Sequence, residues 1–537
     1  MQGSKISEPG KGKPQIIYNT DNIPVWVVPA PYTEEKVSLT VDYLTDSQVD
    51  VLCWSMYGGF IAYWPSKVIE NWPEKYQGEP NELASDAWHK QIDYLPTLIR
   101  ETQQRGIKFF PSFRMNDSHH RSTPEDAVAF WKAHQEYRLW EVTAGETYYN
   151  ATLDYSCPEV RQHVFDAIYE YVHLYDVDGV ELDFFRNPYI FQPSEAWAKR
   201  QILTDFIKQI KLALTAIGEK KHKRIDLLIR VPFAEDRYTQ PGENRLVLAG
   251  MDVEVWIKNQ YMDILVMSYG ENNFDQAVEP WRSLCRAHNI LFYPAIEARS
   301  AVHHMSTPVR CDNLPLPNIA VKETTNETIM RQRAAAQNFL AQGVDGVYMF
   351  NYPCLLYEEV WTKAEFERLT GVVSEMGDLE TLKGKAKQYV FWRNLPITAE
   401  SGRPPRYHQT LTFHVLDFDM DDDNTQVTLT FRQAAEKNPH AEGDYVQDPF
   451  VAPGWVTYIL NGKKIADEWI RRTRQPAGKI SSGFAVTEHE LIEITVTAEM
   501  MVCGENTLAF HIDRFPASRD PYVRFFELLV DVIPATP

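Results

Sequence analysis

The sequence has little that would suit a membrane or a nucleic-acid partner. No apolar run approaches the roughly 18 residues that a membrane span needs, and residues 1–14 contain no apolar signal-peptide core. Basic residues are in deficit, because 74 acidic side chains against 54 basic ones give a formal net charge of −20. Such a chain repels phosphates, so we expect neither nucleic acid nor membrane as a partner. We favour a periplasmic or secreted bacterial location, with any signal peptide absent from this chain, and the oligomeric state stays open.

Motifs for cofactors and metals are missing as well. There is no GxGxxG or GxxxxGK loop for a nucleotide, no HExxH for zinc and no GxSxG elbow for a serine hydrolase. The six cysteines are widely scattered and form no CxxC pair, so we interpret them mainly as buried free thiols. The acidic run from Asp417 to Asn424 resembles a calcium loop but lacks the glycine and the distal glutamate of one. We therefore predict no cofactor and no metal.

The first two thirds of the chain alternates short β-branched or aromatic runs with amphipathic stretches, which is typical of a parallel sheet wrapped by helices. Eight strand–helix repeats favour a closed ring over an open sheet. We predict an α/β fold, a (β/α)₈ TIM barrel over residues 37–383, preceded by an N-terminal extension over residues 1–36. The eight predicted strands are Val51–Met56, Ile107–Phe113, Ala151–Tyr155, Val177–Phe184, Arg224–Val231, Met262–Ser268, Ile290–Ile296 and Gly346–Phe350.

The pattern changes to a period of two residues after about residue 376. Such alternation is typical of antiparallel strands, and Asn461-Gly462 is a strong hairpin turn because both residues tolerate positive φ. Prolines cluster between residues 384 and 406, where we place the boundary, and we predict an accessory β-sandwich over residues 384–537. Its expected strands are Gln409–Phe413, Gln426–Phe431, Val456–Leu460, Leu491–Thr497, Thr507–Ile512 and Phe525–Val532.

Functional side chains of a TIM barrel lie at the C-terminal ends of the strands and in the loops that follow. The fourth predicted strand ends in Glu181 and Asp183, which are two residues apart and so point the same way. A charged side chain is costly in the apolar helix layer, so both should point into the barrel. We expect Glu181 to pair with an arginine such as Arg230, and Asp183 to contact substrate. The alternative is that both carboxylates only neutralise arginines.

Cleavage of a glycosidic bond generally needs two carboxyl groups, one to protonate the leaving oxygen and one to act as nucleophile or to activate water. Glu297 ends the seventh predicted strand, across the barrel from the fourth, and is our candidate partner for Asp183. The alternative for Glu297 is an ion pair with Arg299. Further carboxylates in reserve are Glu235, Asp236 and Glu271.

Arginines are enriched at the predicted strand ends. A guanidinium group can donate two parallel hydrogen bonds to a carboxylate or sulfate group, so this enrichment favours an anionic sugar as the substrate. A closed network between these arginines and the carboxylates is the alternative. Aromatic rings just after the first predicted strand could stack on sugar faces. The predicted substrate-binding residues are Arg114, Asn116, His119, Glu181, Arg186, Arg230, Tyr269, Trp54 and Tyr57.

Two strings of residues resemble a known family. Leu153–Ser156 followed by Pro158–Arg161, and then Tyr175–Phe184, look like the motifs of the glycoside-hydrolase-like family 10 proteins, which are bacterial barrel proteins. The resemblance covers roughly residues 37–352 and implies a barrel fold, and its motifs specify the substrate much less. This chain has Glu181 where the family pattern has histidine, so only Asp183 carries over directly. Phe185 stands where chitinase-type barrels carry their catalytic glutamate, so a chitinase mechanism is not expected.

These observations predict a glycoside hydrolase that acts on a polysaccharide or oligosaccharide, with uronic or sulfated glycans among the candidates. Asp183 and Glu297 are the expected catalytic residues, and carbohydrate is the expected partner. A non-catalytic glycan-binding barrel with its carboxylates held by arginines is one alternative. A polysaccharide lyase with His119 or Tyr269 as base is another.

Overall fold

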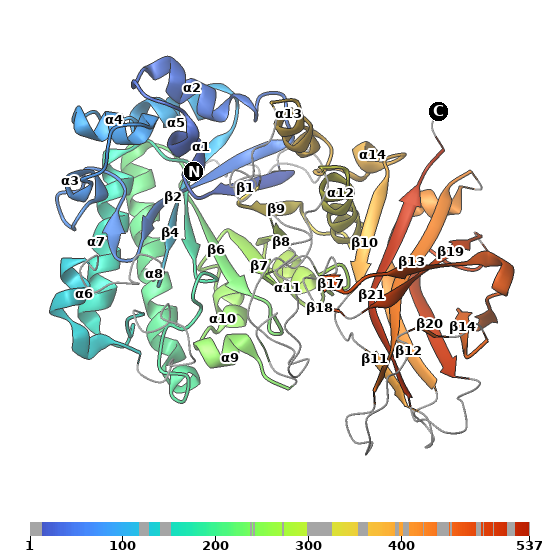
Figure 1. Ribbon diagram of the computed structural model, residues 1–537. Coiled ribbons are helices and arrows are strands. Elements are labelled where there is room, and N and C mark those ends of the chain that lie inside the picture. Colours follow the sequence, from blue (N-terminus) through green and yellow to red (C-terminus); the bar gives the residue numbers. More distant parts are fainter. Residues whose placement is uncertain are drawn as a thin grey trace. The chain divides into compact units, whose positions relative to one another are not determined.

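The computed structural model places eight parallel strands in a closed ring (Figure 1). Strand β1 pairs with both β2 and β9, which closes the ring and confirms the TIM barrel. A short strand β3 (Ile61–Ala62) adds an antiparallel hairpin to the end of β2. The ring strands are β1 (Ile16–Thr20), β2 (Val49–Gly58), β4 (Lys108–Arg114), β5 (Gly179–Asp183), β6 (Asp226–Pro232), β7 (Ile264–Ser268), β8 (Leu291–Glu297) and β9 (Val347–Phe350).

The structure describes residues 13–117, 128–139, 152–236, 239, 242–270, 273–297, 325–352, 363–391, 397–400, 408–422, 424–437, 450–451, 454–479, 485–486, 488–497, 499–512 and 521–535. Among the six cysteines, Cys53, Cys157, Cys285 and Cys503 are free thiols, and Cys311 and Cys354 lie outside these ranges. Within them, no helix is both long and apolar enough to span a membrane.

Two strands differ from the prediction. Strand β1 lies inside residues 1–36, so the barrel begins before residue 37 and this segment is not only an extension. The described part of the predicted strand Ala151–Tyr155, residues 152–155, is not in the ring, and Leu153 makes an isolated bridge to Arg138. Because one strand is gained and one is lost, Asp183 still ends the fourth strand and Glu297 the seventh.

Helices cover the outside of the ring (Figure 1). α7 (Pro158–Leu174) begins at a proline, whose missing N–H costs nothing at the first helical position. Its N-cap is Cys157. The other helices of this part of the chain are α1 (Ile23–Val27), α2 (Glu34–Asp42), α3 (Trp72–Lys75), α4 (Leu83–His89), α5 (Leu95–Gln104), α6 (Ala129–Ala133), α8 (Ala196–Lys221), α9 (Arg245–Ala249), α10 (Val253–Lys258), α11 (Trp281–Ala287) and α13 (Lys363–Gly371).

The interior of the barrel is apolar at its N-terminal half and polar toward the C-terminal strand ends. Inward-facing side chains such as Val51, Leu228 and Tyr293 form one buried cluster. Gly179 opens β5 because a Cβ there would lie 2.3 Å from the ring of Phe110. The small residue lets that ring fill the barrel axis beneath the polar side chains, and this packing supports the site above it.

The chain divides into two compact units. The first contains the whole ring. The second contains described residues 273–277 and 325–342 together with the chain from Asp378 onward, so α12 (Thr325–Ala341) groups with the C-terminal part. The predicted boundary near residue 384 therefore differs from the observed division, which also assigns α12 to the second unit. The reason is that α12 packs against β10 (Lys387–Phe391). Hydrophobic periodicity does not reveal such a contact between segments far apart in sequence.

The second unit is an antiparallel β-sandwich, and all six predicted strands are present. Rings from both sheets pack between them, and the rings of Phe510 and Phe525 stack with centroids 3.8 Å apart. One sheet contains β10, β11 (Ile397–Glu400), β13 (Gln426–Lys437), β16 (Ile470–Gln475), β19 (His489–Val496) and β21 (Pro521–Ile533). The other contains β12 (His408–Val415), β14 (Val456–Leu460), β15 (Lys463–Lys464) and β20 (Gly504–Ile512), and the remaining elements are the pair β17 (Gly478–Lys479) and β18 (Ala485–Val486) and the helix α14 (Leu379–Leu382).

Candidate active site

Asp183 ends β5 and is fully buried. One carboxylate oxygen accepts hydrogen bonds from the backbone N–H groups of Phe185, at 2.9 Å, and Arg186, at 3.3 Å. The other accepts from Nη1 of Arg230 at 3.2 Å. The strand end therefore fixes this carboxylate with three donors, which suits an ionised group.

Arg230 of β6 joins the two predicted catalytic residues. Its Nη2 donates to Glu297 of β8 at 3.3 Å, while its Nη1 contacts Asp183. Nε donates to the hydroxyl of Ser268 at 2.8 Å, and the ring of Phe350 lies 3.8 Å from the guanidinium carbon. Since Arg230 is fully buried and Glu297 keeps 12% of its side chain exposed, the pair is open to solvent only on the Glu297 side.

Glu181 lies one layer deeper than Asp183. Its carboxylate accepts hydrogen bonds from Nδ2 of Asn19 at 2.7 Å and from the hydroxyl of Tyr348 at 2.5 Å. Burial raises the pKa of Glu181 above its usual value, and the nearby charge of Asp183 raises it further. No direct ion pair with Arg230 is seen, so the predicted partner is replaced by neutral donors from β1 and β9.

Replacing Glu181 by glutamine is expected to change how stability depends on pH. An acid with a raised pKa in the folded chain keeps its proton while the unfolded chain loses it, so rising pH destabilises the fold. The free energy of unfolding of the wild type should therefore fall relative to Glu181→Gln as pH rises from about 4.5, the ordinary pKa of glutamate, into the neutral range. Urea unfolding of both proteins across this range measures the difference, and a constant difference would contradict the raised pKa.

Arg114 of β4 makes a second charged cluster at the strand ends. It donates to Asp21, which directly follows β1, and its Nη1 lies 3.3 Å from Asp117. Burial opposes ionisation of Asp21, but Arg114 and Arg186 outweigh it and lower the pKa of Asp21. Asn351, after β9, also donates to Asp21. The sequence analysis missed Asp21 because it missed β1.

Several predicted binding residues are committed to the fold. The amide of Asn116 is fully buried and bonds to both backbone groups of Leu153 and to the carbonyl of Tyr189, at 2.7 to 3.0 Å. It therefore holds the connection after β4 in place, and its predicted contact with substrate stays untested. Tyr269 is 95% buried, with 5% of its surface exposed. Its predicted role stays untested.

The two aromatic residues expected to stack on sugar face away from the barrel interior. Cys53 lies in the interior cluster, so its neighbour Trp54 points to the opposite face of β2. The ring of Tyr57 packs 5.8 Å from Phe113, in the layer between strands and helices. Both side chains are fully buried, so neither offers an open ring face.

The remaining predicted residues are placed in part. Asp236 is buried against Arg245, whose Nε lies 3.2 Å from its carboxylate, and Glu235 is exposed. His119, Glu271 and Arg299 lie outside the described residues. No group of metal-binding side chains occurs in the part of the chain that the structure covers.

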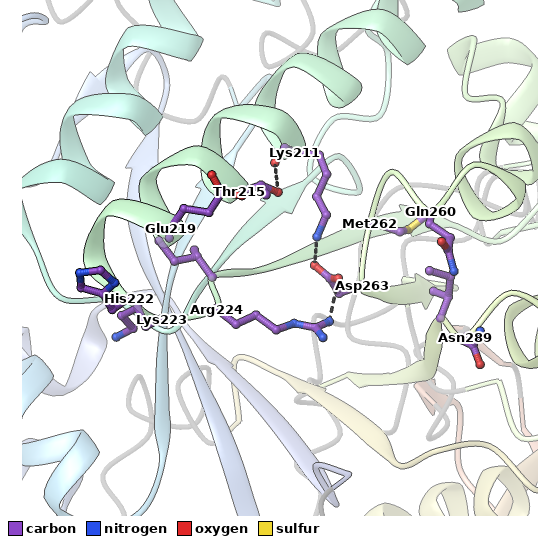
Figure 2. Close-up of a pocket in the computed structure, with 13 residues that line it drawn as sticks. Lys211, Thr215, Glu219, His222, Lys223, Arg224, Gln260, Met262, Asp263 and Asn289 are labelled. Atoms are coloured by element: carbon purple, nitrogen blue, oxygen red, sulfur yellow. Dashed lines mark hydrogen bonds and ion pairs between the residues drawn. The ribbon is translucent and has the colours of Figure 1, made fainter. Parts of the chain in front are cut away.

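A cavity of about 690 Å³ lies at the other end of the barrel (Figure 2). It is lined by the C-terminal part of α8 and by residues just before β6, β7 and β8, so it is at the N-terminal strand ends. Figure 2 shows Asp263 between Lys211 and Arg224, and Nη2 of Arg224 lies 2.9 Å from its carboxylate. Because the charges here pair with one another and barrel chemistry is located at the opposite face, this cavity is not the candidate site.

Comparisons with known proteins agree with the barrel. Residues 17–204 match the family model described as glycosyl hydrolase-like 10, which confirms the resemblance for this part of the chain. No curated protein matches the sequence.

Three solved structures illustrate the structural likeness. An alpha-L-fucosidase isoenzyme 2 from Paenibacillus thiaminolyticus is 12% identical, with 70% of this chain and 51% of that one covered and a TM-score of 0.42. A noncanonic maltogenic alpha-amylase from Thermotoga neapolitana is 11% identical, with 93% and 99% covered and a TM-score of 0.36. The PgaB glycoside hydrolase domain from Bordetella bronchiseptica is 13% identical, with 68% and 99% covered and a TM-score of 0.38. This chain spans about half the length of the fucosidase, and likenesses at these scores add no argument about activity.

Proposed function

We propose that the chain is a glycoside hydrolase that cleaves a polysaccharide or oligosaccharide. The observation that carries the proposal is the convergence of Asp183 and Glu297, from the fourth and seventh strands, on the single guanidinium of Arg230. Both carboxylates lie within 3.3 Å of that group, close enough to flank a glycosidic bond at the separations of about 5 to 9.5 Å that such enzymes use. The match of residues 17–204 to a glycosyl hydrolase-like family supports the same conclusion.

The two carboxylates have different surroundings and so suit different roles. Asp183 accepts three hydrogen bonds from fixed donors, which suits the ionised residue that attacks the sugar or activates water. Glu297 accepts a hydrogen bond from Nη2 of Arg230 and keeps part of its side chain exposed, which suits the residue that protonates the leaving oxygen. Asp183 then also stabilises the positive charge that develops on the sugar ring.

An anionic substrate has less support than the arginine count suggested. Arg114 pairs with Asp21 and Asp117, and Arg230 pairs with Asp183 and Glu297. Each of these two guanidinium groups is therefore paired with two carboxylates, which supports the alternative of an arginine–carboxylate network. Neither is left over to bind a uronate or sulfate group.

The proposal predicts that the full chain releases new reducing ends from at least one oligosaccharide. A panel of neutral and acidic pentasaccharides incubated with the protein, followed by a reducing-end assay and mass spectrometry of the products, measures this. Product masses that increase by one water per cleavage indicate hydrolysis, because a lyase product carries a double bond instead and absorbs in the ultraviolet. Binding of a pentasaccharide without any cleavage would contradict the proposal.

A specific observation also favours a second candidate function. The salt bridges of Arg230 to both carboxylates fit a glycan-binding barrel without catalysis, in which arginine holds the carboxylates in place. In that case Asp183→Asn should leave the affinity for glycans unchanged. Neither the wild type nor any variant should then cleave a glycan. The reducing-end assay separates the two functions directly.

A further inference from the structure

Two adjacent strand ends form a corner that the catalytic residues do not use. We name Asp21, Asn22 and Asn351 the β1–β9 corner, because Asp21 and Asn22 follow β1 and Asn351 follows β9. The backbone N–H of Asn351 donates to the carbonyl of Asn19 at 2.9 Å, and its side-chain amide donates to Asp21. These contacts hold the corner together at the mouth of the barrel.

The β1–β9 corner lies between the two catalytic carboxylates around the ring. Asn351 directly follows Phe350, which is the register partner of Glu297. On the other side, Asp21 is bound by Arg114, which is the register partner of Asp183. The corner is therefore linked to Glu297 through Phe350 and to Asp183 through Arg114.

Two buried oxygen atoms of the corner lack a hydrogen-bond partner. The Oδ1 atoms of Asn22 and Asn351 accept no hydrogen bond, and the residues are only 5% and 4% exposed. A buried acceptor left without a donor costs free energy, so such atoms in a native fold usually serve water or a ligand. Both residues also have positive φ, 65° and 52°, a strained conformation that is frequent at functional sites.

The corner offers hydrogen-bond acceptors, namely two amide oxygens and the carboxylate of Asp21, whose side chain is 24% exposed. Sugar hydroxyl groups donate to such atoms, whereas uronate and sulfate groups offer only acceptors and a repelling charge. We infer that the β1–β9 corner is a sugar-binding subsite that takes the hydroxyl groups of a neutral sugar. The inference rests on the proposed function and adds the class of its substrate.

Glycine variants test the subsite with little risk to the fold. Glycine adopts positive φ without strain, so Asn22→Gly and Asn351→Gly remove the acceptor while easing the backbone. Asn351→Gly also removes the donor to Asp21, so Asn22→Gly is the cleaner of the two tests. The side chain of Asn22 makes no cap hydrogen bond to α1, so no helix contact is lost there. Each variant should bind a neutral oligosaccharide about 3- to 10-fold more weakly, the effect of one lost hydrogen bond. Asn289→Gly is the matched control, because Asn289 has a φ of 58° and lines the cavity at the opposite end of the barrel.

Calorimetry can measure binding in an Asp183→Asn background, so that the probes stay intact. The probes are cellopentaose, maltopentaose, mannopentaose and xylopentaose, with a pentameric galacturonate and a sulfated galactan pentasaccharide as anionic counterparts. We expect a neutral probe to bind best, the two corner variants to weaken it and Asn289→Gly to leave it unchanged.

The outcomes also separate the subsite from the proposed function. Unchanged affinity in both corner variants, or stronger binding of an anionic probe than of every neutral one, would overturn the subsite, and water would then be the partner of the two oxygens. If the wild type still cleaves a probe in that case, the proposed function stands without the subsite. If no probe binds or is cleaved, both inferences fail.

Discussion

Asparagine in place of Asp183 is expected to lower the turnover rate of oligosaccharide hydrolysis by about 10³-fold. Asparagine has the same size and can still accept a hydrogen bond from Arg230 or from the backbone N–H groups that hold Asp183. It cannot attack the sugar or take a proton from water, so the loss should fall on kcat more than on binding. Initial rates with the best substrate of the panel, together with its affinity, measure both quantities.

Two further variants make this result specific. Asp263→Asn removes a carboxylate that pairs with Lys211 and Arg224 at the opposite end of the barrel, and should leave kcat unchanged. Glu297→Gln should lose cleavage of natural glycosides but keep much more activity on an aryl glycoside whose leaving group needs no proton. Equal losses in Asp263→Asn and Asp183→Asn would show that a general loss of folded protein, and not chemistry, is being measured.

The alternation of strands and helices was enough to predict the barrel, because each strand of a parallel ring is a short apolar run between amphipathic helices. Strand β1 was missed because the short run Ile16–Thr20 lies within the segment that we assigned to the N-terminal extension. The run Ala151–Tyr155 has the composition of a strand, but its described residues 152–155 form an isolated bridge at Leu153 and no ladder. Composition predicts that a segment can form a strand. Whether it pairs with neighbouring strands depends on the tertiary fold of the barrel.

The site was predictable where strand geometry alone decides the outcome. The spacing of Glu181 and Asp183 and the position of Glu297 placed all three side chains inward at the correct strand ends. The hydrogen-bond partners of these side chains were not predictable. From the sequence, Arg230 could reach Glu181 or Asp183, and Asn116 could contact substrate or the backbone. The orientation of Trp54 was also mispredicted. Neighbouring residues along a strand point to opposite faces, so Trp54 faces away from the barrel interior that Cys53 faces.

The acidic run Asp417–Asn424 now has an explanation other than calcium. Asp417 and Asp419 accept hydrogen bonds from Nζ of Lys387, at 3.1 and 2.7 Å, and Lys387 is fully buried. The hydroxyl of Tyr389 donates to Asp417 at 3.0 Å. Burial raises the pKa of Asp417, although Lys387 opposes this. The ammonium group therefore occupies the place between these carboxylates that a cation would take in a calcium loop.

Replacing Lys387 by methionine is expected to lower the free energy of unfolding of the β-sandwich by about 3 to 5 kcal/mol, because it leaves two buried carboxylates without a cation. Calorimetry of the full chain should show a fall in its Tm on the order of 10 °C. The loss should shrink at low pH, where Asp417 protonates, and in Lys387→Met combined with Asp417→Asn and Asp419→Asn. Lys464→Met, at an exposed position of β15, is the control with little effect. A loss below about 1 kcal/mol would mean that water reaches the cluster and that the pair is screened as on a surface.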